Sequence, residues 1–248
     1  MLQFQNVSKI FNPNTPNQRT ALDNVSITLQ KDDFVTLIGG NGAGKSTFMN
    51  AICGVFLVDS GSIILDGKDI TFLPEYKRAR SIGRLFQDPM KGTAPNMTIA
   101  ENLALAYGRA AKLPFRIGIG KKSLDLFREK LAMLELGLED RMKTKMGLLS
   151  GGQRQAVTLL MATVCTPKIL MLDEHTAALD PATAHKVLQL TKDIIAKNNI
   201  TTIMVTHDME SALELGNRTI MFAEGKVVLD VQGSERNELT VEKITKMF

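Results

Sequence analysis

The most constraining feature of the sequence is a glycine-rich stretch in its first fifth, Gly39-Gly40-Asn41-Gly42-Ala43-Gly44-Lys45-Ser46-Thr47. An apolar run at residues 34–38 leads into it, and a helix-like segment at 48–52 follows it. This order predicts a buried strand, a tight loop and a helix. Glycines let the backbone turn closely, so that several N–H groups and the positive end of the next helix can converge on an anion.

Four positions of this stretch match the phosphate-binding pattern G-x-x-x-x-G-K-[ST], namely Gly39, Gly44, Lys45 and Ser46. Lys45 adds a mobile positive charge. The Ser46 hydroxyl can ligate Mg²⁺, which prefers oxygen ligands and commonly bridges nucleotide phosphates. A chance match would occur in roughly 1 in 100 chains of this length, so the stretch predicts a nucleotide-binding site.

Bulk composition describes a chain that can bury an ample core, since 44% of its 248 residues are hydrophobic. The net charge of +4 fits an anionic ligand, but interspersed acidic and basic residues are only weak evidence for nucleic-acid binding. We find neither a signal-like start nor an apolar run of membrane-spanning length, and therefore expect a soluble, cytosolic chain. Cys53 and Cys165 lie in predicted helices and are expected to be buried thiols rather than a disulfide.

Strand signals occupy both ends of the chain. Residues 2–7 and 25–29 alternate apolar and polar side chains, and the turn formers at 12–18 between them predict a surface loop. Hairpin turns are predicted at Asp66-Gly67 and Glu224-Gly225. Further strands are predicted at 62–65, 82–86, 169–172, 200–205, 219–222 and 226–229, and further helices at 181–197, 209–215 and 240–248. Strands alternating with helices indicate a parallel sheet.

Residues 88–166 show several helix signals and almost no strand signal. The capping box Thr98-x-x-Glu101 predicts a helix start. Pro114, Gly118 and Gly120 break the region into pieces, so we predict an inserted helical subdomain rather than one long helix. Apolar residues at helical spacing, expected to form its core, are Leu124, Phe127, Leu131, Leu134 and Leu138.

A second motif, Leu149-Ser150-Gly151-Gly152-Gln153, precedes a helix predicted to begin near Arg154. With the glycine loop, it makes the chain resemble the ATP-binding subunit of an ABC transporter, whose signature is L-S-G-G-Q. The resemblance implies that Ser150, Gly151 and Gly152, with Gln153 beside them, bind the γ-phosphate of ATP held by a second subunit. A hydroxyl, flexible backbone N–H donors and a helix N-terminus suit such an anion site. The alternative is an ordinary Ser N-cap followed by glycines.

The resemblance implies catalytic roles for four further residues. Asp173 and Glu174 match the Walker B carboxylates, so that Asp173 would hold Mg²⁺ and Glu174 would polarise the attacking water. Their place after a buried strand favours function over an ordinary exposed loop. Gln87 matches the Q-loop residue that contacts the metal or the water, and His207 matches the switch histidine that contacts the γ-phosphate.

Two more positions have both a family role and an ordinary structural one. Asp180 matches the family's D-loop, and it also has the form of an N-cap before Pro181. Phe11 stands where the family has an adenine-stacking aromatic, although a Phe at a strand end is often part of the core. His175 stands where many members have Pro, and Asp208 is expected to be an N-cap only.

The predicted fold is α/β, with a P-loop NTPase (RecA-like) core and an N-terminal antiparallel β portion at 1–87 and 167–230. A helical subdomain at 88–166 is inserted into this core, and a tail follows at 231–248. The resemblance implies an ATPase that uses ATP and Mg²⁺ in a head-to-tail dimer at the cytoplasmic face of the membrane.

Transport would run through a separate membrane permease, as import, with an extracytoplasmic substrate-binding protein and no nucleic acid. Residues 86–98 further resemble ATPases of amino-acid importers, and apolar residues such as Met90 and Met97 in 87–107 are expected to form a groove for a permease helix. Two alternatives stay open. One is a soluble ABC ATPase of translation or DNA maintenance, and the other is a switch that binds ATP without turnover.

Overall fold

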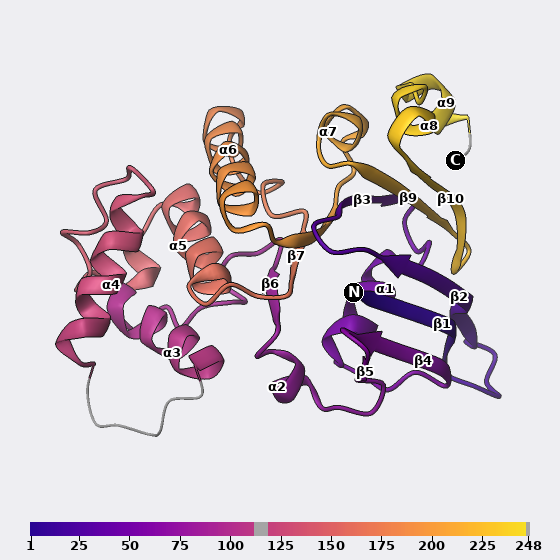
Figure 1. Ribbon diagram of the computed structural model, residues 1–248, viewed down its shortest axis with the longest axis horizontal. Helices are drawn as coiled ribbons and strands as arrows, with labels where there is room; N and C mark the ends of the chain where they lie inside the picture. Colours follow the sequence, from indigo (N-terminus) through magenta and orange to yellow (C-terminus); the bar gives the residue numbers. More distant parts are fainter. Residues whose placement is uncertain (112–118, 247–248) are drawn as a thin grey trace. The chain divides into compact units, whose positions relative to one another are not determined.

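The computed structural model describes residues 1–111 and 119–246 (Figure 1). Contacts divide the chain into two compact units, one of Met1–Arg78 with Thr201–Phe248 and the other of Ala79–Ile200. Among the described residues, no helix has the length and apolar character needed to cross a membrane.

The first unit contains an antiparallel sheet with the strand order β2-β1-β4-β5. Its strands are β1 (Leu2–Phe11), β2 (Arg19–Leu29), β4 (Ser60–Leu65) and β5 (Lys68–Asp69). The loop at 12–18 is exposed, as predicted, and β1 and β2 extend to its ends because they form one hairpin. Asp66 and Gly67, with φ of 50° and 72°, form the predicted turn between β4 and β5.

The same unit contains strands of mixed direction around β3 (Phe34–Gly39). β3 pairs in parallel with β8 (Thr201–Val205) on one side and with β9 (Arg218–Ala223) on the other. After the predicted turn at Glu224-Gly225, β10 (Lys226–Gln232) pairs antiparallel with β9. β3 is buried along nearly its whole length, which explains its continuous apolar sequence.

Helix α1 (Lys45–Cys53) joins the two sheets of this unit through Phe48. The Phe48 ring lies 4.7 Å from the ring of Phe4 in β1 and 5.2 Å from that of Phe222 in β9. Because α1 begins directly after the glycine loop, this packing also fixes the loop.

The remaining helices of the first unit are short: α2 (Glu75–Arg78), α7 (Met209–Glu214), α8 (Gly233–Asn237) and α9 (Val241–Thr245). The predicted helix at 240–248 corresponds to α9, which starts after an N-cap at Thr240, and residues 247–248 lie outside the described part. Arg78 is buried at the end of α1 and donates hydrogen bonds to the carbonyl oxygens of Ala51, Ile52, Thr71 and Leu73.

The second unit pairs β6 (Ile82–Leu85) in parallel with β7 (Ile169–Asp173). Its helices are α3 (Ile99–Ala111), α4 (Lys121–Ala132), the 3-10 turn η1 (Met146–Leu148), α5 (Gly151–Thr163) and α6 (Pro181–Asn198). Within the described part of 88–166 no strand forms, as predicted. The capping box at α3 is confirmed, since Thr98 N–H donates to Glu101 Oε2 (2.7 Å) and Glu101 N–H donates to Thr98 Oγ1 (3.2 Å).

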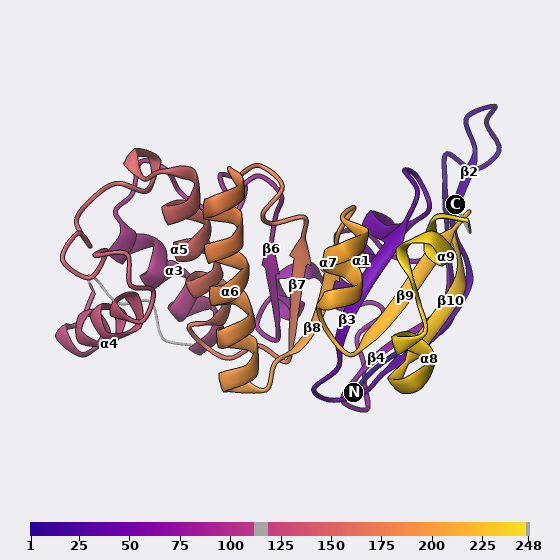
Figure 2. The ribbon, with the colours of Figure 1, turned by 90° about the horizontal axis from the view of Figure 1, so that it is seen from above.

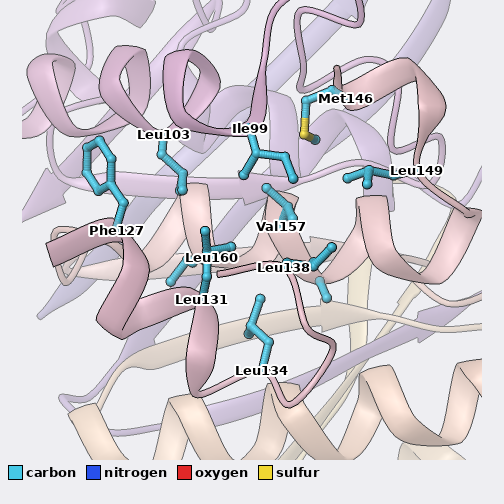
Figure 3. Close-up of a cluster of buried hydrophobic side chains, with 11 residues drawn as sticks. Ile99, Leu103, Phe127, Leu131, Leu134, Leu138, Met146, Leu149, Val157 and Leu160 are labelled. Atoms are coloured by element: carbon cyan, nitrogen blue, oxygen red, sulfur yellow. The ribbon is translucent and has the colours of Figure 1, made fainter. Parts of the chain in front are cut away.

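A cluster of buried apolar side chains holds α3, α4 and α5 together (Figure 3). Phe127, Leu131, Leu134 and Leu138 belong to it as predicted, whereas Leu124 is only partly buried and is not one of its members. Other members are Ile99, Leu103, Met146, Leu149, Ala156, Val157 and Leu160.

Several smaller sequence predictions concern breaks and thiols. Gly120 is the N-cap of α4, while Pro114 and Gly118 lie outside the described residues. Cys53 is buried in α1, and Cys53 and Cys165 do not form a disulfide, as predicted. The placement of Cys165 in a helix was wrong, since α5 ends at Thr163, and its side chain is only partly buried.

Candidate active site

The glycine loop leaves the carboxyl end of β3 and opens directly into α1. Gly39 has φ of 144°, and a Cβ atom there would lie 2.3 Å from the Phe222 carbonyl oxygen, so only glycine fits. Gly44 takes the N-cap position of α1, where no side chain caps the helix. The first N–H groups of α1 can therefore bind phosphate oxygens together with the helix's positive end.

The Lys45 ammonium group is held over this loop. Its Nζ donates to the carbonyl oxygens of Gly39 (2.5 Å) and Gly40 (2.9 Å), and the residue is only 7% exposed. Phosphate oxygens could replace these carbonyls as acceptors and would add opposite charge. Ser46, on the first turn of α1, is exposed.

Phe11 is the last residue of β1, in the same unit as the glycine loop. In the hairpin register it is opposite Arg19, whose Nη2 donates a short hydrogen bond to the Gly42 carbonyl oxygen. The Phe11 ring is partly buried and meets the Phe56 ring edge-on at 5.4 Å. Phe11 is therefore connected to the glycine loop through its hairpin partner Arg19, and its ring packs within the unit.

His207 follows β8, the parallel neighbour of β3, and its side chain is exposed. Leu37 of β3 pairs with Val205, so His207 and the glycine loop leave the same edge of the sheet. Asp208 caps α7 as predicted, with its carboxylate accepting from the N–H groups of Glu210 and Ser211 at 3.2 Å each. His207 is thus fixed between a strand end and a capped helix.

In the second unit, Gln87 and the two carboxylates emerge at the carboxyl ends of paired strands, since Leu85 of β6 lies opposite Leu172 of β7. Asp173 Oδ2 lies 3.5 Å from Arg84 Nη2. Glu174 is half-buried. Its φ of 44° is a left-handed backbone conformation, which is uncommon for residues other than glycine. The strand pair therefore presents one amide and two carboxylates at one edge.

His175 replaces proline in the family pattern and is 2% exposed. Its Nε2 lies 3.1 Å from Thr191 Oγ1, and this hydroxyl donates to the Val187 carbonyl oxygen, so Nε2 carries the hydrogen. Burial lowers the pKa of His175 to about 4. The imidazole is therefore neutral at physiological pH and joins the end of β7 to α6.

The signature helix α5 begins at Gly151, and the predicted start near Arg154 was wrong. Ser150 is the N-cap of a capping box, in which Gln153 N–H donates to Ser150 Oγ (3.3 Å) and Ser150 N–H donates to Gln153 Oε1 (3.2 Å). The two glycines thus occupy the first two helical positions. Their N–H groups lie at the positive end of α5, as an anion site needs.

The signature packs against the start of α6. A Cβ atom at Gly152 would lie 2.1 Å from Thr183 Cγ2, so a larger residue would have to displace the Thr183 side chain. Asp180 caps α6 by accepting from the Thr183 N–H (3.1 Å), and hydrogen bonds from the Thr183 side chain and backbone lower the pKa of Asp180. The predicted N-cap is confirmed, and the signature and Asp180 are brought together.

Three residues of these sites were missed by sequence reasoning. Arg19 contacts the glycine loop, and Asn102 bonds both the N–H and the carbonyl of Ala94. Arg154 donates to the carbonyl oxygens of Met146, Gly147 and Leu149, at the start of the signature. Asn102 is buried among the apolar residues of α3. The sequence signal that could have identified Asn102 is a polar residue on an otherwise apolar helix face.

Each unit carries side chains whose chemistry suits Mg²⁺. The first unit supplies the Ser46 hydroxyl and the second unit supplies the Gln87 amide and the Asp173 carboxylate, and each is an oxygen ligand of the kind that Mg²⁺ prefers. Among the described residues, no group of three or more His, Cys, Asp or Glu side chains could hold a metal ion.

The parallel strands, the glycine loop after β3 and the lysine held over it define a P-loop nucleotide-binding protein. A family model described as ABC transporter matches residues 22–177. The chain therefore belongs to the ABC transporter family, as an ATP-binding and ATP-hydrolysing subunit.

Relatives and solved structures agree with this assignment. A tyrosine transport ATP-binding protein of Clostridioides difficile (strain R20291) is 45% identical, over all of this chain and 98% of its own length. A methionine import ATP-binding protein of Corynebacterium glutamicum is 34% identical over 92% of this chain, and the match covers 61% of that relative.

Among solved structures, a dimeric ATP-binding cassette in a post-hydrolysis state, bound to ADP and Pi, has a TM-score of 0.79 and 30% identity, covering 94% of this chain and 98% of that one. Another cassette of an ABC transporter has a TM-score of 0.82 and 28% identity, covering 100% and 98%.

Proposed function

We propose that two copies of this chain bind Mg-ATP in a head-to-tail dimer and use its hydrolysis to import an amino acid or a related solute. The observation that carries this proposal is that one chain holds two anion-binding helix starts, the glycine loop at α1 and the signature at α5. In a head-to-tail pair, each ATP would lie between the loop of one chain and the signature of the other. The dimeric cassette with ADP and Pi supports the pairing.

Within each site we assign the following roles. Lys45 and the N–H groups from Gly40 to Thr47 bind the phosphates, and Phe11 stacks on the adenine. When bound, Mg²⁺ neutralises phosphate charge, and Ser46, Gln87 and Asp173 are the residues that would hold it.

Hydrolysis would depend on Glu174 as the acceptor that orients and polarises the attacking water. His207 donates to the γ-phosphate. From the partner copy, Ser150, Gly151, Gly152 and Gln153 contact the same phosphate, with Asp180 beside them. The in-line reaction would therefore need both copies closed around the nucleotide.

The assembly would sit at the cytoplasmic face of the membrane, attached through a permease. Met90 is 37% exposed in the segment after Gln87, and Met97 is partly buried, so Met90 is the better contact for a permease helix. The solute class follows from relatives whose names give tyrosine and methionine transport, and an extracytoplasmic binding protein would deliver it.

The variant Glu174→Gln tests the proposal. The amide keeps the shape of the carboxylate but loses its charge as an acceptor, so we expect ATP to bind without turnover and the dimer to persist. Size-exclusion chromatography with Mg-ATP and a phosphate-release assay measure both effects. Glu129→Gln, on the exposed face of α4, is the matched control. A variant that hydrolyses ATP at the parental rate, or stays monomeric at high concentration, contradicts the proposal.

A further inference from the structure

The C-terminal segment 233–246 contributes one buried charged side chain to the first unit. Arg236, in α8, is 9% exposed. Its Nη2 donates to the carbonyl oxygens of Ala212 (3.1 Å) and Leu213 (2.9 Å), and it makes a further short bond to that of Leu215. A single guanidinium group from this segment thus binds three carbonyls at the end of α7.

These bonds fix a helix that is too short to be stable alone. α7 has 6 residues, and a helix of this length is marginal in water without tertiary contacts. Its last carbonyls need partners outside the helix, and a cation there also complements the helix dipole. The opposite end of α7 is capped by Asp208, the neighbour of His207. The two ends of α7 are therefore held by Asp208 and Arg236.

The same guanidinium group is connected to the strand that carries the glycine loop. Arg236 Nε donates to Thr219 Oγ1 (3.0 Å), which lies 2.9 Å from Thr36 Oγ1 in β3. Thr36 Oγ1 in turn donates to the Ala212 carbonyl oxygen of α7 (2.9 Å). Both threonines are fully buried. Because buried hydrogen-bonded groups are costly to separate, this network resists any shift of α7 along β3.

Apolar packing by α9 also connects the C-terminal segment 233–246 to α7 and β3. Ile244 of α9 is fully buried and packs in one cluster with Ile38, Ala212 and Met221. Ile38 directly precedes Gly39, and Ala212 belongs to α7. Figure 2 shows α7, α8 and α9 together with β3, β9 and β10 in this unit.

We propose that Arg236 is a positioning residue for ATP hydrolysis, which sets α7, and through it His207, against the glycine loop. The C-terminal segment then belongs to the support of the catalytic site. This inference rests on the proposed contact of His207 with the γ-phosphate.

The test compares steady-state ATP hydrolysis of the parental protein and Arg236→Met. Methionine keeps much of the volume but cannot bind the carbonyls, so kcat should fall about ten-fold while KM for ATP changes less than about two-fold. Arg236→Lys keeps the charge and should recover part of kcat. Glu235→Gln, on the exposed side of the same helix, is the matched control and should behave like the parental protein.

A double-mutant cycle separates positioning from a general structural role. In a His207→Ala background, Arg236→Met should lower the melting temperature but cause no further loss of kcat, because the two residues act in series. Additive losses, or an unchanged kcat in Arg236→Met alone, overturn the inference. If His207→Ala keeps the parental kcat, the proposed role of His207 is wrong as well. If Arg236→Met does not fold, the same measurements are made on Thr219→Val, which keeps a similar side-chain shape but removes the link to Thr36. The same outcomes then support or overturn the inference.

Discussion

Acid should destabilise the protein through His175. Burial lowers the pKa of this imidazole to about 4, whereas in the unfolded chain it ionises near the ordinary value of 6.5. Between these values the unfolded chain binds the proton more readily than the folded one. The free energy of unfolding must therefore fall as the pH drops from 6.5 towards 4, and the contribution of this group is fully present above 6.5.

The magnitude follows from the difference between the two pKa values. The whole shift is worth about 3 kcal/mol, of which about 2 kcal/mol is lost by about pH 5. Urea unfolding, followed by far-UV circular dichroism near pH 7.5 and near pH 5, measures this loss. The comparison variant is His175→Gln, which cannot titrate but can still donate to Thr191.

The parental protein should lose about 2 kcal/mol more than the variant between the two conditions. All other titratable groups are the same in the two proteins, so the comparison isolates His175. An equal pH dependence in the two proteins would refute the reasoning, because it would mean that His175 is not held neutral by burial.

Three further predictions concern single side chains. Lys45→Ala should abolish tight ATP binding while leaving the fold intact, because it removes the ammonium group over the glycine loop; a fluorescent-nucleotide titration measures this, and parental affinity would contradict the site. Arg78→Met leaves buried carbonyls without their donor and should cost about 3 kcal/mol in urea unfolding, whereas a cost within about 0.5 kcal/mol would show that water replaces the guanidinium. Met90→Glu should weaken permease assembly and solute uptake but spare the ATP affinity of the isolated chain, with Met90→Leu as control; unchanged uptake in the folded variant would move the permease contact elsewhere.

The order of elements could be predicted from the sequence because the signals that set it are local. Turn formers such as Asp66-Gly67 and caps such as Asp180 act over a few residues, and the structure confirms both. The start of α5 was misplaced for a related reason. Two glycines disfavour a helix interior, but at the first two helical positions the Ser150 capping box and the close approach to Thr183 override that preference.

Contacts between distant segments could not be predicted in this way. Arg236 and Thr36 are joined by a network that no spacing rule encodes, and Arg19 reaches the glycine loop only because a hairpin register places it there. A buried arginine has the same sequence appearance as an exposed one. Whether an arginine is buried depends on tertiary packing, which cannot be read from a single sequence.

The pairing of β3, the strand that carries the glycine loop, determines how late in synthesis the phosphate loop can form. Leu37 pairs with Val205 and Ile220, so β3 finds both of its neighbours only after most of the chain has been made. The second unit, by contrast, is one continuous segment, Ala79–Ile200, and can fold as soon as it emerges. Competence to bind ATP is therefore expected late in synthesis, when β8 and β9 arrive, and a nascent chain stalled before Thr201 should have a folded signature helix but no working phosphate loop.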